Sequence, residues 1–380
     1  MATSRQPRGV PVGGQFRPAS LAEPDVVVLP SDLDFVELWD EAADTPAPAA
    51  IATTPPQPDG TPAWVATPDM VAEATSIKEW MDALEGHLTI DQVDTMPTAA
   101  EMEQRIATLG VRVDSLVLTR LEELAQDGGS GPDQQSRAVV DVLSTLRPMG
   151  AEGVSDPLPV ERWSHRTAIG LVKENLWRLP TDWISRSSTT GAPMAVRTTS
   201  GAGHFIPSKH RWVMDEPTSI EVSSPWEPSS PRATDIRQRD DGTWTWTEVR
   251  RPERLVEAPE IALPPKARAG AGGVVVHEFC HRMESIRPGI PMVERAFLDR
   301  RSGGRRARPV GRKGRRYTAI DGGFVDPYVG RTYGDVPFLE VLSTGVESVH
   351  SGRWGGLMGW DGSPSDPDHR AFVLGVLAAA

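Results

Sequence analysis

The spacing of apolar residues divides the chain into segments of different character. Residues up to about 67 alternate Pro, Ala, Thr and Asp with few aromatic residues and no regular period. Such a composition buries too little apolar surface to offset its ordering entropy, which predicts a disordered, acidic leader over 1–67. Inside it, SDLDFVELWDE (residues 31–41) combines acidic and apolar residues. This run is either a segment that folds against a protein partner or a solvated fragment with transient helicity.

From Pro68 onward, apolar residues recur every three or four positions, which predicts helices. One stripe runs from Met70 to Leu84, a longer one from Met102 to Leu124, and a third from Val139 to Leu146. A Gly- and Pro-containing breaker at 128–133 separates the last two. No cluster of titratable groups accompanies these stripes. We therefore expect residues 68–150 to form a helical interaction domain without an activity of its own.

A fourth helix is predicted from about Leu158 to Arg178, ending before Pro180. The spacing then changes to short alternating runs bounded by turn residues, which is typical of strands. Strands are predicted at 204–214, 219–223, 235–239, 243–249 and 260–263. The residues Asp240, Asp241 and Gly242 predict a hairpin between the third and fourth of them. A small, largely antiparallel sheet is therefore expected just before the three valines at 274–276.

Composition limits the compartment more than it limits the function. The chain has 380 residues, a net charge of -12 and one cysteine, Cys280, so it forms no intrachain disulfide. The N-terminal residues lack the apolar core of a signal peptide, and no run approaches the roughly 20 apolar residues of a membrane span. We expect a cytoplasmic protein without a membrane partner, with association to a virion as a second possibility.

Charge is distributed unevenly. Residues 21–60 hold nine Asp or Glu and no Lys or Arg, whereas residues 300–316 hold nine basic residues and no acidic one. The basic run is rich in Gly, which predicts a mobile loop over or beside a cleft. It could steer acidic substrates, contact phosphate or nucleic acid, or simply be solvated. Because no aromatic residue offers stacking, and because the chain as a whole is acidic, a nucleic-acid partner is disfavoured.

The stretch GVVVHEFCHRMES carries the chemistry of the sequence. It places His277, Glu278 and His281 in the order His-Glu-x-x-His. On a helix, the two histidines lie one turn apart on the same face and can hold one metal ion between them. Glu278 lies about 100° round the helix, where it can reach a water at the metal without being a ligand. The alternative is a buried helix with two incidental histidines.

The order of the predicted elements, a helix, a small sheet and then a helix with His-Glu-x-x-His, resembles that of the zincin metallopeptidases. The resemblance covers about Pro159 to the C-terminus. It implies an α+β zincin-like domain over 158–380. It also implies that His277 and His281 bind Zn²⁺ and that Glu278 is the general base. Two positions depart from the pattern: Arg282 is charged where the family has an uncharged residue, and Cys280 stands where a small residue is usual. Cys280 is expected to pack in the core and not to bind metal.

The third ligand distinguishes subfamilies of zincins. Residues 286–293 contain no His, so the version with a closely following third histidine does not apply. The apolar run VPFLEVLSTGVESVH, residues 336–350, predicts a later helix with Glu340 near its start and Ser343 three residues on. This resembles the ligand helix of the gluzincin-like group and implies Glu340 as third ligand. Glu347, on nearly the same face, is the reserve candidate, either as ligand or as a partner that fixes a histidine tautomer.

Tyrosines lie just ahead of Glu340 in an extended, turn-rich segment. Tyr328 and Tyr333 are therefore candidates to donate a hydrogen bond to a developing oxyanion, and His350 is a further candidate. His204 and His210, on expected strands, are expected to be structural or surface residues. The start RQPRGVPVGGQF and the end DPYVGR...EVLSTGVES...DPDHRAFVLGVL resemble uncharacterised actinobacterial and actinobacteriophage proteins. That resemblance groups these tyrosines with the metal helix but assigns no substrate.

Two function classes follow from the sequence. The first is a zinc metallopeptidase that hydrolyses peptide bonds of a protein or peptide substrate, using His277, His281, Glu340 and Glu278. The second is a phage-derived structural or virion-associated protein, in which a metal only fastens two helices together and no catalysis occurs. The leader or the helical region would supply the contact with a protein partner in either case.

Overall fold

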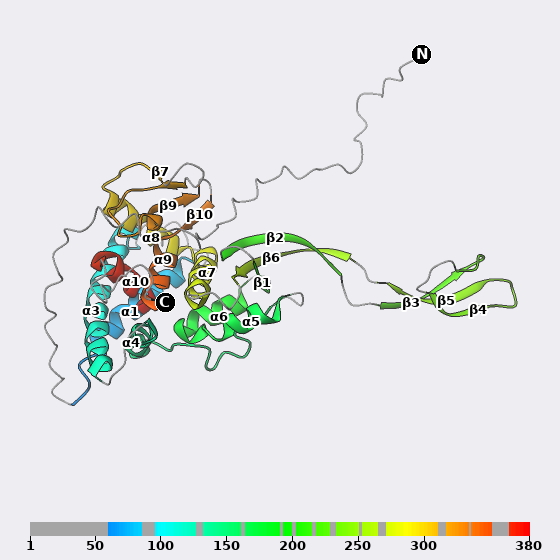
Figure 1. Ribbon diagram of the computed structural model, residues 1–380, viewed down its shortest axis with the longest axis horizontal. Coiled ribbons are helices and arrows are strands. Elements are labelled where there is room, and N and C mark those ends of the chain that lie inside the picture. Colours follow the sequence, from blue (N-terminus) through cyan, green and yellow to red (C-terminus); the bar gives the residue numbers. More distant parts are fainter. Residues whose placement is uncertain are drawn as a thin grey trace, which may run out of the picture.

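The computed structural model describes residues 60–85, 96–126, 132–160, 164–190, 193–199, 203–214, 218–228, 233–250, 253–264, 271–310, 317–333, 336–351 and 365–380. It is a mixed α+β structure with small sheets (Figure 1). Residues 1–59 of the predicted leader, with the segment at 31–41, lie outside these residues. The leader prediction was wrong for residues 60–67: Ala63 is buried, and the Ala66 amide donates to Thr145 Oγ1 at 3.0 Å. No helix in the described ranges combines the length and apolar character needed to cross a membrane.

Three helices form where the first three apolar stripes predict them. They are α1 (Pro68–Ala83), α3 (Ala99–Gln126) and α4 (Pro132–Ser144). The start of α3 is fixed by a reciprocal capping box: the Glu101 amide donates to Thr98 Oγ1 at 3.2 Å, and the Thr98 amide donates to Glu101 Oε2 at 2.8 Å. α1 begins with Pro68, whose missing amide hydrogen is not needed in a first turn.

The prediction of one continuous helix over residues 158–178 was wrong. Val160 forms an isolated bridge to Met194, and the helical part consists of α5 (Arg166–Lys173) and the 3₁₀ turn η2 (Leu176–Arg178). Asn175 interrupts the helix, since its side chain donates to the Leu171 carbonyl at 2.8 Å. The apolar spacing continues through the break because the turn still buries Leu176. The helix α6 (Thr181–Thr189) follows directly.

The predicted strands form, but they belong to two sheets instead of one. β2 (His204–Met214) pairs antiparallel with β6 (Glu253–Leu263), and β1 (Ala195–Thr198), which was not predicted, pairs parallel with β6. This sheet, in the order β1-β6-β2, lies beside the helix with the histidines (Figure 1). A second sheet, in the order β3-β5-β4, contains β3 (Thr218–Ser224), β4 (Ala233–Gln238) and β5 (Trp244–Arg250) and projects from the body. The predicted hairpin is confirmed as β4–β5.

The C-terminal half supplies most of the elements around the candidate site. α7 (Ala271–Ile286) and α8 (Gly289–Ser302) are followed by a third sheet in the order β10-β9-β8-β7. Its strands are β7 (Arg308–Val310), β8 (Tyr317–Ala319), β9 (Arg331–Tyr333) and β10 (Val336–Leu339), with the 3₁₀ turn η3 (Pro327–Gly330) before β9. The last helices are α9 (Val341–Ser351) and α10 (Pro367–Ala379).

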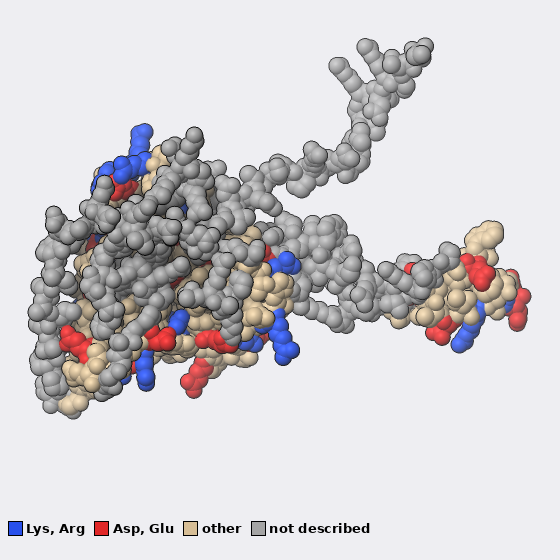
Figure 2. Space-filling view, viewed as in Figure 1, with Lys and Arg blue, Asp and Glu red and all other residues tan. Residues whose placement is uncertain are grey.

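The basic run at 300–316 is not a single mobile loop. Arg300 and Arg301 belong to the last turn of α8, and β7 begins at Arg308. Arg300 is paired with Glu103 and Asp368, each at 2.9 Å, and Arg301 is paired with Asp366 at 2.8 Å. These two arginines therefore fasten α8 to α3 and α10. Exposed arginines remain near β7, where Figure 2 shows basic side chains on the surface. Residues 311–316 lie outside the described residues.

One hydrophobic core extends from α1 to α10, so the described helices before residue 150 pack together with those after 158. α10 is buried on all sides and crosses α3 at two glycines. A Cβ added at Gly375 would lie 2.1 Å from the Ile106 carbonyl oxygen, and one added at Gly110 would lie 1.7 Å from that of Ala371. The crossing therefore depends on the absence of side chains at both positions.

Substituting Gly375→Ala should lower the free energy of unfolding by about 3 kcal/mol, because the methyl group collides with backbone that cannot move without separating two helices. Chemical denaturation measures the effect. Gly170→Ala is the matched control: Gly170 lies in α5 with no atom within 4 Å of an added Cβ. The control should gain about 0.5–1 kcal/mol from the better helix propensity of alanine. Equal stability of the two variants would contradict the packing described for α3 and α10.

Candidate metal centre

The two histidines of the sequence motif lie in the middle of α7 and face the same way. The rings of His277 and His281 have centroids 4.9 Å apart and an interplanar angle of 80°. His277, Glu278 and His281 are 1%, 1% and 5% exposed. Potential ligand atoms of these three residues lie within 4.8 Å of one another. α7 therefore forms a buried group that could hold a metal ion.

Glu340 reaches this group from the residue just before α9. Its Oε2 atom lies 3.3 Å from His277 Nε2 and 3.6 Å from His281 Nε2. The start of α9 is held in place by Glu294 of α8, whose Oε1 accepts a hydrogen bond from the Leu342 amide at 2.8 Å. Fully buried Glu340 thus points its carboxylate at both Nε2 atoms. Glu294 was not among the candidate residues chosen from the sequence. It lies in a helix without a clear apolar stripe, so nothing in the sequence distinguished it from an ordinary exposed glutamate.

The two separations from Glu340 Oε2 to the imidazole nitrogens are compatible with a four-coordinate metal ion such as zinc. Nitrogen and oxygen ligands at about 2.1 Å from zinc, placed at the corners of a tetrahedron, lie about 3.4 Å from one another. The separations of Glu340 Oε2 from His277 Nε2 and His281 Nε2, 3.3 and 3.6 Å, are close to that value. Two imidazoles and one carboxylate leave a fourth corner for water or substrate.

The other ring nitrogen of each histidine faces a carboxylate. His277 Nδ1 lies 3.1 Å from Glu347 Oε2, and His281 Nδ1 is hydrogen-bonded to Glu284 Oε2 at 3.0 Å. Carboxylates in this position fix the tautomer and turn Nε2 toward a metal. Glu284 is therefore placed to fix the tautomer of His281. Glu347 lies close to His277 Nδ1 without a hydrogen bond to it, and Glu340 lies between the two Nε2 atoms. Glu284 was missed in the sequence, although its position three residues after His281 is the signal that could have identified it.

Glu278 differs from the other acidic side chains of the site. Within the described ranges, neither of its carboxylate oxygens has a hydrogen-bond partner. Burial raises the pKa of Glu278 to about 7. A buried carboxylate without a partner is destabilising and is therefore uncommon where it has no function.

Carboxylates outnumber positive groups in the centre of the site. Burial alone would lower the pKa of His277, but Glu340 and Glu347 raise it to about 10. Burial would likewise raise the pKa of Glu340, but His281 and His277 hold it well below its usual value. In the metal-free protein, protons on the imidazoles thus balance the carboxylates. A divalent cation would provide the same balance and release those protons.

The two candidate tyrosines form a chain that ends on Glu340. The Tyr333 phenol donates to Glu340 Oε1, and Tyr328 Oη lies 3.2 Å from Tyr333 Oη. Arg331 donates to Tyr328 Oη at 2.8 Å, and its guanidinium lies 4.4 Å from the centre of the Tyr333 ring. The structure therefore brings both tyrosines to the site, in contact with Glu340.

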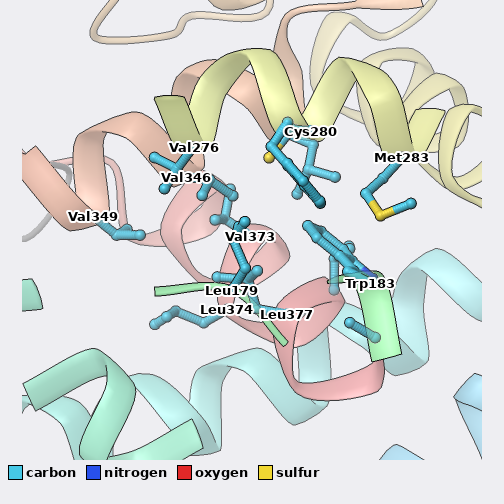
Figure 3. Close-up of a cluster of buried hydrophobic side chains, with 14 of the residues drawn as sticks. Leu179, Trp183, Val276, Cys280, Met283, Val346, Val349, Val373, Leu374 and Leu377 are labelled. Atoms are coloured by element: carbon cyan, nitrogen blue, oxygen red, sulfur yellow. The ribbon is translucent and has the colours of Figure 1, made fainter. Parts of the chain in front are cut away.

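The remaining candidates lie elsewhere. His350 Nδ1 is hydrogen-bonded to Ser136 Oγ at 2.9 Å, so this histidine links α9 to α4. Cys280 is fully buried and lies among Val276, Met283 and Trp183 in the hydrophobic cluster of Figure 3. Its packing role is thus visible directly. His204 begins β2 and lies 4.0 Å from Glu260, while the side chain of His210 lies outside the described residues.

Arg282 is buried and donates to the Thr190 carbonyl at 2.6 Å, which ties α7 to the end of α6.

Gly203, just before β2, adjoins the general-base candidate: an added Cβ would lie 2.9 Å from Glu278 Oε1 and 2.3 Å from Val274 Cγ1. The backbone just before β2 therefore lies close to Glu278, and a side chain at position 203 would collide with Val274 and Glu278. Two surface pockets along α3 include no residue of the site.

Comparison with known proteins adds no family assignment: no family model, no curated protein and no solved structure matches this chain.

Proposed function

We propose that this protein is a zinc-dependent hydrolase of peptide bonds. The observation that carries the proposal is the pairing of a three-donor cluster, His277, His281 and Glu340, with the unpartnered carboxylate of Glu278. A metal that only stabilised the fold would not require a buried acid without a partner beside it. A general base does require one, because its oxygens must be available to the reacting water.

Each residue has a defined part in this mechanism. Zinc held by these donors would lower the pKa of a water molecule toward about 7 and polarise a substrate carbonyl. Glu278 would take a proton from that water as its oxygen bonds to the carbonyl carbon, and would return the proton to the amine nitrogen as the C–N bond breaks. Glu284 holds the imidazole of His281 in the ligand orientation through its hydrogen bond to Nδ1, and Glu347 lies 3.1 Å from His277 Nδ1. Burial excludes other water and strengthens these interactions.

The position of β2 supports a peptide as substrate. β2 is the outer strand in the described sheet order β1-β6-β2, and Gly203 at its start adjoins the Glu278 carboxylate. An extended peptide that aligned with β2 by strand addition would present a carbonyl to a metal held by the histidines, beside Glu278.

One observation favours the second candidate function, a structural metal site in a phage-derived or virion-associated protein. His277 and Glu340 are 1% and 0% exposed, and a closed site is typical of structural zinc. In that case the only role of the four acidic side chains would be to hold the metal and to connect the helices α7 and α9. These side chains are Glu278, Glu284, Glu340 and Glu347.

The experiment that separates the two is a proteome-derived peptide library incubated with the full-length protein. We expect cleavage at a restricted set of sequences, loss of cleavage after treatment with a zinc chelator, and recovery when Zn²⁺ is added back. Mass spectrometry of new peptide ends measures it. Zinc-loaded protein that leaves the library intact would favour the structural role.

A further inference from the structure

The two oxygens of Glu340 have different surroundings. Oε2 faces the Nε2 atoms of both histidines and accepts a hydrogen bond from Ser343 Oγ at 3.1 Å. Oε1 accepts the phenol proton of Tyr333. A carboxylate with a donor fixed on one oxygen cannot rotate to exchange its oxygens without breaking that bond. Tyr333, which is not one of the three metal-ligand candidates, therefore determines which oxygen of Glu340 faces the histidines.

The direction of the hydrogen bonds along the tyrosines follows from the two ends of the chain. Glu340 lies between two imidazoles and is an acceptor, so Tyr333 must donate to it. The Tyr333 oxygen can then accept from Tyr328, whose own oxygen accepts from Arg331, which is only a donor. Each phenol gives one proton and receives one. The sequence Arg331, Tyr328, Tyr333, Glu340 is thus a relay of donors with a fixed direction.

Ring contacts hold the relay in place. The Arg331 guanidinium lies 4.4 Å from the centre of the Tyr333 ring and 5.2 Å from that of Tyr328. Tyr328 is 7% exposed and sits in η3, whose first turn is capped by Asp326 accepting from the Tyr328 amide at 2.8 Å. β9, which carries Arg331 and Tyr333, pairs with both β8 and β10. Tyr333 is therefore held in place by the Arg331 guanidinium and by the two strands that pair with β9.

We propose that Tyr333 is a positioning residue: through its hydrogen bond to Glu340 Oε1 it directs Oε2 to the metal, and Tyr328 and Arg331 hold it in that role. This inference rests on the proposed metal site. It replaces the role as oxyanion donor that the sequence indicated for both tyrosines, because the Tyr333 proton is already committed to Glu340. The expected consequence of losing the phenol is weaker metal binding, and not only slower turnover.

The test measures the affinity of the metal-free full-length protein for Zn²⁺ by competition with a chromophoric chelator. Tyr333→Phe keeps the ring and removes the hydroxyl, and its Kd for Zn²⁺ should rise by about 10–100-fold, as is usual for partners of metal ligands. Tyr328→Phe leaves the bond to Glu340 in place and should raise Kd by about 2–10-fold. The absorption spectrum of the Co²⁺-loaded Tyr333→Phe variant should also change, because the ligand oxygen is no longer fixed. Melting curves of the metal-free forms verify that each variant is folded.

The outcomes are distinguishable. An unchanged Zn²⁺ affinity and Co²⁺ spectrum in Tyr333→Phe, with reduced turnover, would assign the phenol to the oxyanion and overturn the positioning role while leaving the zinc hydrolase intact. If Tyr333→Phe does not fold, unchanged affinity in Tyr328→Phe overturns the relay. Wild-type protein that binds no Zn²⁺ overturns both this inference and the proposed function.

Discussion

Replacing Glu278 by Gln should reduce peptide cleavage by a factor of about 10²–10⁴ while leaving zinc bound. The amide has the shape of the carboxylate but cannot take a proton from water. Neither oxygen of Glu278 has a hydrogen-bond partner among the described residues, and His277, His281 and Glu340 are unchanged in this variant, so we expect the donor cluster to be unaffected. Cleavage rates and zinc content of the same preparation give the result.

The same substitution should not lower stability. A buried carboxylate without a partner destabilises the folded protein, and the neutral amide is less costly to bury. We expect a melting temperature equal to or above that of the wild type, which is the pattern of a residue retained for activity. Glu123→Gln, at a partly exposed position in α3, is the matched control and should alter neither cleavage nor zinc content. Retained cleavage by Glu278→Gln would remove the assigned mechanism.

Removing the metal should have the second largest effect, on stability. Glu278, Glu284, Glu340 and Glu347 surround two histidines in a site with little exposure, so the metal-free protein must carry extra protons there. A metal present at about 1,000 times its Kd stabilises the folded state by about 4 kcal/mol. For a chain of this size we expect the melting temperature to fall by roughly 6 °C on chelation.

Glu340→Ala tests whether this stabilisation comes from the assigned site. Without its carboxylate, the variant should bind zinc weakly, and added zinc should shift its melting temperature little. The comparison is made by calorimetry, with and without zinc, on wild type and variant. A variant that zinc still stabilises as strongly as the wild type would mean that Glu340 is not a ligand.

The sequence was sufficient to predict the parts of the fold that depend on local spacing. α1, α3 and α4 follow the apolar stripes, and β4–β5 follows the Asp-Asp-Gly turn. The split of the fourth helix depended on the side chain of Asn175 bonding to its own backbone, which apolar spacing does not reveal. β1 and the strands β7 to β9 were missed because they are three or four residues long, too short for a period. β10 was predicted wrongly as the start of the helix at 336–350, which begins only at Val341.

The candidate site shows the same division. His277, Glu278 and His281 follow from a helix of known period, and Glu340 was selected from a resemblance about 60 residues downstream. Glu284 and Glu294 depend on which face of α7 and α8 meets α9, which is a tertiary property. The contact between Tyr333 and Glu340 could be suspected from their proximity in sequence. The role of Tyr333 in this contact could not be predicted, because it depends on which oxygen of Glu340 the phenol reaches.

The most direct test of the central claim is the zinc content of the purified full-length protein, measured by mass spectrometry of the metal alongside Glu340→Ala. We predict about one zinc per wild-type chain, and a fraction of that in the variant. Wild-type protein without zinc after incubation with the ion, or equal zinc in both proteins, would contradict a centre formed by His277, His281 and Glu340.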